Sequence, residues 1–356
     1  MVKLIFKRIM LFYIALALVA SPVELLAAHK ESHKRIYTSQ QNTLTKHRIS
    51  SRYKGKRQKT SLKLRQARQL QIANQQRIML GEDYNGSGIL RLSSNKALII
   101  NQNTGEIIYA KNTNQPTPIA SITKLMTAMV MLDAKQSLDD EISVSDQDVD
   151  HLKGTSSRLA VGSKLSRSDM LQLALMSSEN RAASALAHNY PGGKIAFVKA
   201  MNDKAHALGL VNTRFADPTG LDSENVSTAE DLVKMVQAAY QYAEIRLAST
   251  SPSHDVYVAG RGYPVGFVNS NGLVRGGEWE IGLSKTGYIT EAGRCLVMQA
   301  TIAGAPMIVV LLDSNGRLTR IGDANRVRKW MEYNSSEPTA TTTGQLPNEI
   351  MASRIS

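Results

Sequence analysis

The sequence predicts a mixed α+β fold, in which an antiparallel β-sheet has flanking helices and carries an all-helical subdomain. Short apolar runs with the strand period lie at both ends of residues 88–333, whereas helical periodicity fills the middle. Gly and Asn turns closely separate the C-terminal runs, which favours antiparallel connections. Strands from both ends are therefore expected to form one sheet, with the helices packed against it.

The first elements are predicted to be a hairpin followed by a helix. Residues 97–101 and 107–110 are apolar runs on either side of an Asn-Thr-Gly turn, which is typical of a β-hairpin. Two prolines then interrupt the chain, and a helical pattern follows through Leu132. This places Ser121 in the first turn of that helix, where its side chain is expected to be accessible.

Three further helices are predicted in the middle of the chain, over residues 165–188, 195–208 and 227–248. The first carries Ser178-Glu179-Asn180 near its middle or in a break. Ser227 and Glu230 have the spacing of a capping box for the third helix.

After Asp255 the apolar pattern changes to that of strands. Four strands are expected, and a final helix is predicted over residues 320–333. The strands are predicted at residues 256–268, 280–289, 294–302 and 306–312.

The N-terminus has the pattern of an export signal. Lys3, Lys7 and Arg8 precede an apolar stretch over residues 9–20, which is shorter than the roughly 20 residues that a spanning helix needs. We expect residues 1–28 to be a signal peptide cleaved near Ala28, or an uncleaved anchor. Either outcome places the rest of the chain outside the cytoplasm.

The basic character of the chain is confined to one segment. The net charge is +13, but residues 29–77 hold 14 Lys and Arg against one acidic residue, whereas residues 78–356 hold 26 against 28. A nucleic-acid-binding fold should be basic over its own surface, so nucleic acid is not an expected partner. Residues 29–87 are predicted to be a flexible basic linker. Residues 29–80 are either simply solvated or contact an anionic wall polymer or lipid surface.

Residues 334–356 are rich in Ser, Thr and Pro and are predicted to be a disordered tail. The single cysteine, Cys295, cannot form an internal disulfide, and its apolar surroundings predict a small buried side chain. No cluster with metal-ligand spacing is evident, so neither a metal nor an organic cofactor is expected.

Three short motifs carry the chemistry: Ser121-Ile122-Thr123-Lys124, Ser178-Glu179-Asn180 and Lys285-Thr286-Gly287. Residues three apart on a helix share a face, so Lys124 is expected beside the Ser121 hydroxyl. A serine nucleophile needs a nearby base, and Lys124 can serve if burial or a second cation lowers its pKa. Each motif alone is common in proteins. The three motifs together, in this order, indicate a site with an activated serine.

The remaining motif residues suit supporting roles in the same site. Lys285 is the natural second cation, and Ser178 can pass a proton between the lysine and a leaving group. Asn180 can hold a substrate amide, and Thr286 can bind a substrate carboxylate. Gly287 lets another segment or a substrate lie against its strand.

These residues, with the strings Pro118-Ile119-Ala120-Ser121, Asp217-Pro218-Thr219-Gly220-Leu221 and Ser284-Lys285-Thr286-Gly287-Tyr288, resemble the low-molecular-mass penicillin-binding proteins of the D-alanyl-D-alanine carboxypeptidase family. The likeness is greatest to their D-alanyl-D-alanine endopeptidase branch. It covers roughly residues 88–333, expected to be the catalytic domain, and implies a β-lactamase/transpeptidase-like fold.

The resemblance implies a periplasmic serine D,D-peptidase that cleaves D-alanyl-diaminopimelyl cross-links of peptidoglycan through an acyl-enzyme and is acylated by β-lactams. Ser121 would be the nucleophile and Lys124 its base, assisted by Ser178 and Asn180. The backbone N–H groups of Ser121 and Tyr288 would form the oxyanion hole. The resemblance also implies that Arg320 joins Lys285, Thr286, Gly287 and Tyr288 in binding the substrate.

Two departures from the family pattern bear on these expectations. Glu179 stands where many relatives have glycine, and it is expected to narrow the site or charge it. No further β-domain or amphipathic anchor is evident after Tyr333, which favours the endopeptidase branch.

Three alternatives remain open: a D-alanyl-D-alanine carboxypeptidase, a serine β-lactamase and a non-catalytic wall-binding module. Glu224 lacks the Glu-x-x-Leu-Asn setting of a class A β-lactamase. A Ser-His-Asp hydrolase is disfavoured because no Gly-x-Ser-x-Gly elbow is present.

Overall fold

A computed structural model describes residues 62–75, 77, 84, 86–258 and 261–336. The chain divides into two compact units, residues 1–73 and 74–356. In the first unit, the described residues 62–73 are helical and exposed, within a helix that runs to residue 75. The predicted signal segment and most of the predicted tail lie outside the described residues. Among the described helices, none is long and apolar enough to cross a membrane.

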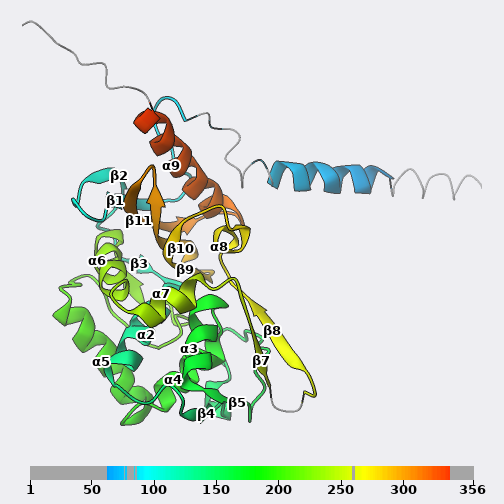
Figure 1. Cartoon of the computed structure of the whole chain (residues 1–356), viewed down its shortest axis with the longest axis vertical. Coiled ribbons are helices and arrows are strands. Elements are labelled where there is room, and N and C mark those ends of the chain that lie inside the picture. Colours follow the sequence, from blue (N-terminus) through cyan, green and yellow to red (C-terminus); the bar gives the residue numbers. More distant parts are fainter. Residues whose placement is uncertain (1–61, 76, 78–83, 85, 259–260, 337–356) are drawn as a thin grey trace, which may run out of the picture. The chain divides into compact units, whose positions relative to one another are not determined.

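The second unit is built around a five-stranded antiparallel sheet with strand order β2-β1-β11-β10-β9 (Figure 1). The N-terminal strand β1 pairs with β11, which brings the two ends of the unit into one sheet. The predicted α+β class is therefore confirmed. The strands are β1 (Lys96–Asn101), β2 (Ile107–Lys111), β9 (Ile281–Ile289), β10 (Gly293–Ile302) and β11 (Ala305–Ser314).

Alternation along the central strands produces two hydrophobic cores. On β10, Cys295 and Val297 face the core shared with the helical subdomain, whereas Leu296 and Met298 face a second core. The C-terminal helix α9 (Thr319–Ser336) covers this second core through Ile321, Ala324 and Val327. Both faces of the sheet are therefore covered, which explains why its central strands are apolar throughout.

The helical subdomain packs on the other face of the sheet, as Figure 1 shows. Its helices are α2 (Lys124–Asp133), α3 (Arg167–Met176), α4 (Asn180–His188), α5 (Gly193–Ala207), α6 (Ala229–Ala239) and α7 (Ala243–Thr250). A 3-10 turn, η1 (Ala120–Thr123), leads directly into α2.

Short elements connect these layers, and the sequence patterns did not indicate most of them. They are β3 (Thr117–Pro118) paired with β6 (Val226–Ser227), β4 (Glu141–Ser143) paired with β5 (Lys164–Ser166), the 3-10 turn η2 (Asp146–Asp148), the hairpin of β7 (Ser253–Tyr257) and β8 (Pro264–Val268), and the short helix α8 (Gly272–Gly276).

Several predicted elements are wrong in detail. The helix predicted over 165–188 begins as β5, and the second motif lies in a break between α3 and α4, which was one of the two predicted placements. The helix predicted over 227–248 is two helices, α6 and α7, and the single strand predicted over 256–268 is the β7–β8 hairpin. In each case the apolar residues keep their spacing across a turn, so the sequence pattern did not show the turn that tertiary contacts impose.

The predicted capping box of Ser227 and Glu230 is also wrong. Thr228 is the N-cap of α6, and its side chain accepts a hydrogen bond from the Asp231 N–H. Ser227 instead belongs to β6 and pairs with Thr117 of β3. The cap therefore lies one residue further along, at the first residue after β6.

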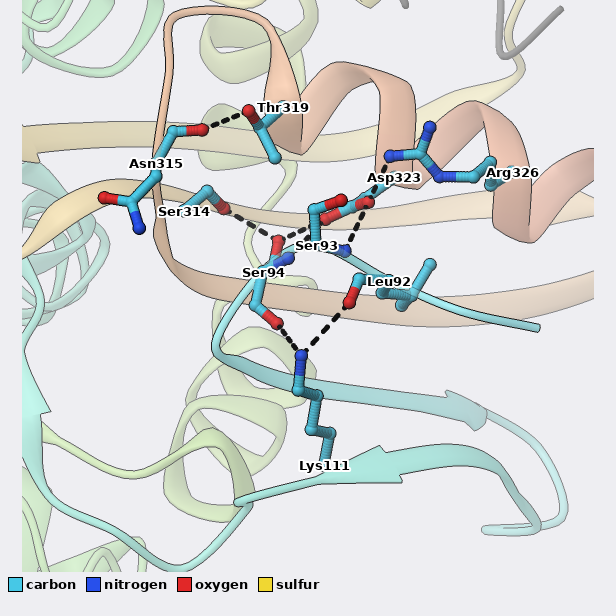
Figure 2. Close-up of polar contacts among 9 residues, drawn as sticks. All are labelled: Leu92, Ser93, Ser94, Lys111, Ser314, Asn315, Thr319, Asp323 and Arg326. Carbon is cyan, nitrogen blue, oxygen red and sulfur yellow. Dashed lines mark hydrogen bonds and ion pairs between the residues drawn. The ribbon is translucent and has the colours of Figure 1, made fainter. Parts of the chain in front are cut away.

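Helix α9 is fastened by a buried carboxylate to the segment just before β1. Asp323 accepts hydrogen bonds from the Ser93 and Ser94 N–H groups at 3.0 and 2.7 Å and from the Ser94 hydroxyl. Arg326 also donates to this carboxylate, as Figure 2 shows. This network fixes the segment that enters β1 against the C-terminal helix.

Candidate active site

The hydroxyl of Ser121 is presented by the 3-10 turn η1 rather than by an α-helix. The apolar side chains of Ile119 and Ile122 are fully buried and anchor this turn in the core. Ala120 has a φ of 48°, a left-handed conformation that is uncommon for a residue with a side chain. Such backbone strain persists only where the surroundings impose it, and it often marks functional sites.

Two glycines leave room for the backbone of this turn. A Cβ on Gly287 would lie 2.9 Å from the Ile119 carbonyl oxygen and 3.1 Å from the Ser121 nitrogen. A Cβ on Gly220 would lie 1.9 Å from the Ala120 carbonyl oxygen, and the φ of Gly220 is +80°. The turn is therefore held between β9 and the loop around Gly220, and both contacts require glycine.

Lys124 lies at the centre of the site and is completely buried. Its Nζ lies 2.9 Å from Ser121 Oγ, 2.8 Å from Asn180 Oδ1 and 2.7 Å from the Thr219 carbonyl oxygen. The predicted proximity of Ser121, Lys124 and Asn180 is thus present in the structure.

Burial lowers the pKa of Lys124 to about 8, although Asp217 and Glu179 act in the opposite direction. Desolvation penalises the charged ammonium, so the neutral amine becomes accessible near neutral pH. A neutral amine beside a hydroxyl can accept its proton, which is the requirement for activating a serine.

Ser178 and Asn180 come together because α3 ends at Met176 and α4 begins at Asn180. Ser178 lies in this break with a φ of 63°, another left-handed residue with a side chain. Its hydroxyl accepts a hydrogen bond from Lys285 Nζ at 2.8 Å. The second motif therefore joins the two lysines, since Asn180 contacts Lys124 and Ser178 contacts Lys285.

Lys285 is buried in β9, the strand at one edge of the sheet. Burial lowers the pKa of Lys285 well below its ordinary value, and Lys124 and Arg320 lower it further. Thr286 donates a hydrogen bond to Ser270 Oγ at 2.7 Å. Tyr288 is exposed, and the Arg294 guanidinium lies 4.3 Å from its ring centroid.

Arg320 lies in the first turn of α9 and is 9 % exposed. Its Nε and Nη1 atoms are buried and have no hydrogen-bond partner among the described residues. Burial, together with the nearby Arg294 guanidinium, lowers the pKa of Arg320 to about 10. A buried guanidinium without an acceptor is costly, and an incoming carboxylate would satisfy it.

Glu179 directs its carboxylate to a hydroxyl rather than to the Lys124 ammonium. It accepts a hydrogen bond from Ser157 Oγ at 2.5 Å, on the loop that precedes β5. Thr155 of the same loop accepts a hydrogen bond from Asn180 Nδ2 at 3.1 Å. The residue that replaces glycine therefore ties this loop to the second motif.

Sequence reasoning assigned no role to the loop around Thr219, although it noted the Asp-Pro-Thr-Gly-Leu string. Thr219 supplies the carbonyl that contacts Lys124. Asp217 shapes the loop by accepting hydrogen bonds from the Thr219 and Gly220 N–H groups. Every residue has a backbone carbonyl, so the residue type does not show which carbonyl contacts Lys124. Only the Asp-Pro-Thr-Gly-Leu string could have indicated this contact.

Among the described residues, no group of three or more His, Cys, Asp or Glu side chains could hold a metal ion. The chemistry that the described side chains can supply is a hydroxyl nucleophile, an amine base, a second buried cation and a guanidinium for an anion.

Comparison with known proteins finds similar sequences. The sequence profile of the D-alanyl-D-alanine carboxypeptidase family matches residues 82–316. A D-alanyl-D-alanine endopeptidase of Pseudomonas aeruginosa is 52% identical over 241 residues, which cover 68% of this chain and 78% of that protein. The D-alanyl-D-alanine endopeptidase of Escherichia coli is 47% identical over 247 residues, covering 69% and 80%.

Solved structures give the same result for the fold. The crystal structure of a Streptomyces DD-transpeptidase superposes with a TM-score of 0.63 at 28% identity, covering 68% of this chain and 98% of that chain. The predicted transpeptidase-like fold is therefore confirmed.

Proposed function

The chain belongs to the D-alanyl-D-alanine carboxypeptidase family, and from this premise we propose that it is a serine D,D-peptidase that acts as a D-alanyl-D-alanine endopeptidase on cross-linked peptidoglycan. The observation that carries the proposal is the buried Lys124 amine, 2.9 Å from Ser121 Oγ. The two relatives above are both named endopeptidases, and each is matched over more than two thirds of its length.

Acylation begins when Ser121 Oγ attacks the carbonyl carbon of a D-alanyl residue and gives its proton to Lys124 Nζ. The developing oxyanion would accept hydrogen bonds from the backbone N–H groups of Ser121 and Tyr288, which often contribute most to such reactions. The C–N bond then breaks, and the leaving amine takes a proton relayed through Ser178. Ser178 suits this relay because it lies in the motif that joins the two lysines. Its own hydroxyl contacts Lys285, and Asn180 of the same motif contacts Lys124.

The substrate carboxylate on the leaving side would bind to Lys285, Thr286 and Arg320. The two unpartnered nitrogens of Arg320 support this assignment. Asn180 would hold an amide of the acyl chain, and Gly287 would let the chain approach the nucleophile. These contacts hold the substrate carbonyl close to Ser121 Oγ. The entropy of bringing the two groups together is then lost on binding and does not slow the attack.

Water must then hydrolyse the acyl-enzyme. A cavity of about 360 Å³ adjoins Asn180 and Thr219 and is lined by Asp148, Asp150, Asp217 and Asp222. This polar cavity offers space for water next to the residues that contact Lys124, and Lys124 would activate the attacking water as it activated the serine.

The decisive test is covalent labelling with a fluorescent penicillin. Ser121→Ala should abolish labelling, because the acyl bond forms on Oγ. A wild-type protein that takes up no label would instead favour a non-catalytic wall-binding module. Sustained hydrolysis of nitrocefin far beyond one equivalent would favour a β-lactamase.

Endopeptidase and carboxypeptidase activities are separated by their products. Incubation with purified muropeptides should remove cross-linked dimers and leave pentapeptide monomers largely intact. Conversion of pentapeptides with dimers left intact would identify a carboxypeptidase.

The cellular setting follows from the same proposal. Residues 1–28 would export the protein to the periplasm, where peptidoglycan and β-lactams are encountered. Basic residues 29–80 would contact anionic wall polymer or lipid headgroups. Cleavage of cross-links would connect the enzyme with cell wall remodelling and cell shape.

A further inference from the structure

An ion pair joins the two walls of the candidate site. Lys153 Nζ lies 2.5 Å from Glu291 Oε1. Lys153 belongs to the loop whose Thr155 contacts Asn180, on the helical side. Glu291 follows β9 in the turn to β10, on the sheet side, three residues after Tyr288.

The position of this pair along β9 follows from the proposed function, on which this inference rests. Gly287 lies level with Ser121, as the short distance from its Cβ position to the Ser121 nitrogen shows. The substrate carboxylate would lie at the Lys285 end of the strand. The acyl chain must therefore leave Ser121 in the opposite direction, past Tyr288 and towards Glu291.

Strand β9 can receive such a chain because it is the edge strand of its sheet. A peptide that pairs with an edge strand uses the unpaired backbone groups for affinity and its side chains for specificity. Tyr288 and Ile289 extend the strand beyond Gly287 by about 7 Å at the usual rise per residue. The residue one or two positions before the acyl D-alanine would thus reach the ion pair.

The pair is well placed to exchange partners. The Lys153 and Glu291 side chains are 28% and 42% exposed, and ion pairs this accessible to water contribute little to stability. The loop that carries Lys153 is also attached to the second motif, because Thr155 accepts a hydrogen bond from Asn180 and Ser157 donates one to Glu179. Opening the pair would therefore leave the loop in place.

We propose that Lys153 and Glu291 form a specificity-determining subsite for the acyl-donor peptide. Lys153 binds a carboxylate, and Glu291 binds an ammonium, on the side chain one or two residues before the acyl D-alanine. In the free enzyme the two groups neutralise each other, and a charged donor side chain replaces one of them.

The test uses three synthetic cross-link mimics, in which the acyl D-alanine is joined to the amine of a second peptide and Lys, Glu or Gln immediately precedes that D-alanine. For each peptide, kcat/KM is divided by the rate of acylation by penicillin in the same variant, which corrects for changes at Ser121. Glu291→Gln should lower this ratio about fivefold for the Lys peptide alone, and Lys153→Gln should lower it about fivefold for the Glu peptide alone. Lys199→Gln, which breaks an exposed pair with Asp203 on α5, is the matched control.

The crossed pattern distinguishes recognition from a structural role. Equal losses for all three peptides would show that the pair only holds the loop, and unchanged ratios would show that the donor does not reach it. Either result overturns the inference. Failure of the proposed function would be seen separately, as a wild-type protein that neither takes up penicillin nor cleaves the Gln peptide.

Discussion

Lys124 must satisfy two opposed demands. Three oxygen atoms surround its Nζ, at Ser121, Asn180 and Thr219, which suits an ammonium with three donors. Complete burial, however, favours the neutral amine, which has two donors and one lone pair. In the neutral form the Asn180 and Thr219 contacts can remain, and the Ser121 contact reverses so that the hydroxyl donates to the amine. The reactive form therefore needs no movement of heavy atoms.

This reversal predicts the pH dependence of acylation. The pKa of Lys124 is lowered to about 8, and the base is the unprotonated form, so its fraction rises with pH. Below pH 8 the acylation rate should fall about tenfold for each pH unit, and above it the rate should level off. Stopped-flow measurement with a fluorescent penicillin between pH 6 and 9 provides the profile. A rate that is flat over this range would contradict the role of Lys124 as base.

At the residue scale, side chains in motifs were predictable and their backbone partners were not. Ser121, Lys124, Ser178 and Asn180 meet as expected, because each identity carries its own chemistry. The Thr219 carbonyl could not be predicted, since every residue has one. The orientation of the Glu179 carboxylate depends on Ser157, which is distant in sequence, so this hydrogen bond could not be predicted from the local pattern.

At the scale of elements, the strained η1 turn depends on the loop behind it. Ala120 adopts its left-handed conformation where the Gly220 loop touches its carbonyl. Ile119, which precedes the turn, and Ile122 within it are buried, so the turn cannot retreat from an added atom. A close-packed interior transmits such a displacement to Ser121.

Gly220→Ala should therefore impair both folding and acylation. The added Cβ meets the Ala120 carbonyl and the φ of +80° is unfavourable for alanine, so we expect a loss of at least about 2 kcal/mol in unfolding free energy. Gly304→Ala is the control, because its φ is +75° but its Cβ would meet nothing within 4 Å. The control should lose only about 1 kcal/mol, from backbone strain.

Urea unfolding and penicillin labelling of both variants check this prediction. If Gly304→Ala slows labelling as much as Gly220→Ala, contact with the η1 turn is not the cause.

The bounds of helices and strands were predicted accurately where glycine marks the turn between them, and poorly where it does not. Strands β9, β10 and β11 were predicted to within two residues, and a glycine marks each connection, Gly293 at the start of β10 and Gly304 before β11. The break between α6 and α7 falls at Tyr240-Gln241-Tyr242, which contains no glycine or proline. Tyr242 is instead placed by hydrogen bonds with Asp133 and Lys204, and such distant contacts are invisible to a periodicity argument.

At the scale of the whole molecule, Asp323 fastens α9 to the segment before β1, within the unit formed by residues 74–356 (the catalytic unit). Its carboxylate is fully buried and receives its bonds from Ser93, Ser94 and Arg326. Asp323→Asn should lower the unfolding free energy by about 3 kcal/mol, because an amide NH2 group replaces one of the two acceptor oxygens and leaves the Ser93 or the Ser94 N–H group unsatisfied.

Asp203→Asn is the matched control for this change. Asp203 pairs with Lys199 on an exposed helix face, so its loss should stay below about 0.5 kcal/mol in the same urea unfolding experiment. Equal losses in the two variants would show that the Asp323 network does not stabilise the junction.

The last prediction concerns the basic N-terminal segment, which carries the excess positive charge but none of the site residues. Residues 29–77 hold almost all of the excess positive charge, and the site residues all lie in the unit formed by residues 74–356. Removal of residues 1–83 should therefore leave the penicillin acylation rate within about twofold, since the described hydrogen bonds that arrange Ser121, Lys124 and Lys285 are all made within residues 84–336. The same deletion should abolish sedimentation with anionic lipid vesicles.

In the full chain, vesicle binding should weaken steeply as salt is raised and should be absent with neutral vesicles, because the attraction is electrostatic. A truncated protein that still binds anionic vesicles would place the contact on the catalytic unit, whose own charge is close to neutral. A truncated protein that penicillin acylates slowly would instead show that the basic segment supports the reactivity of Ser121. The inference that this segment binds lipid and takes no part in acylation would then be wrong.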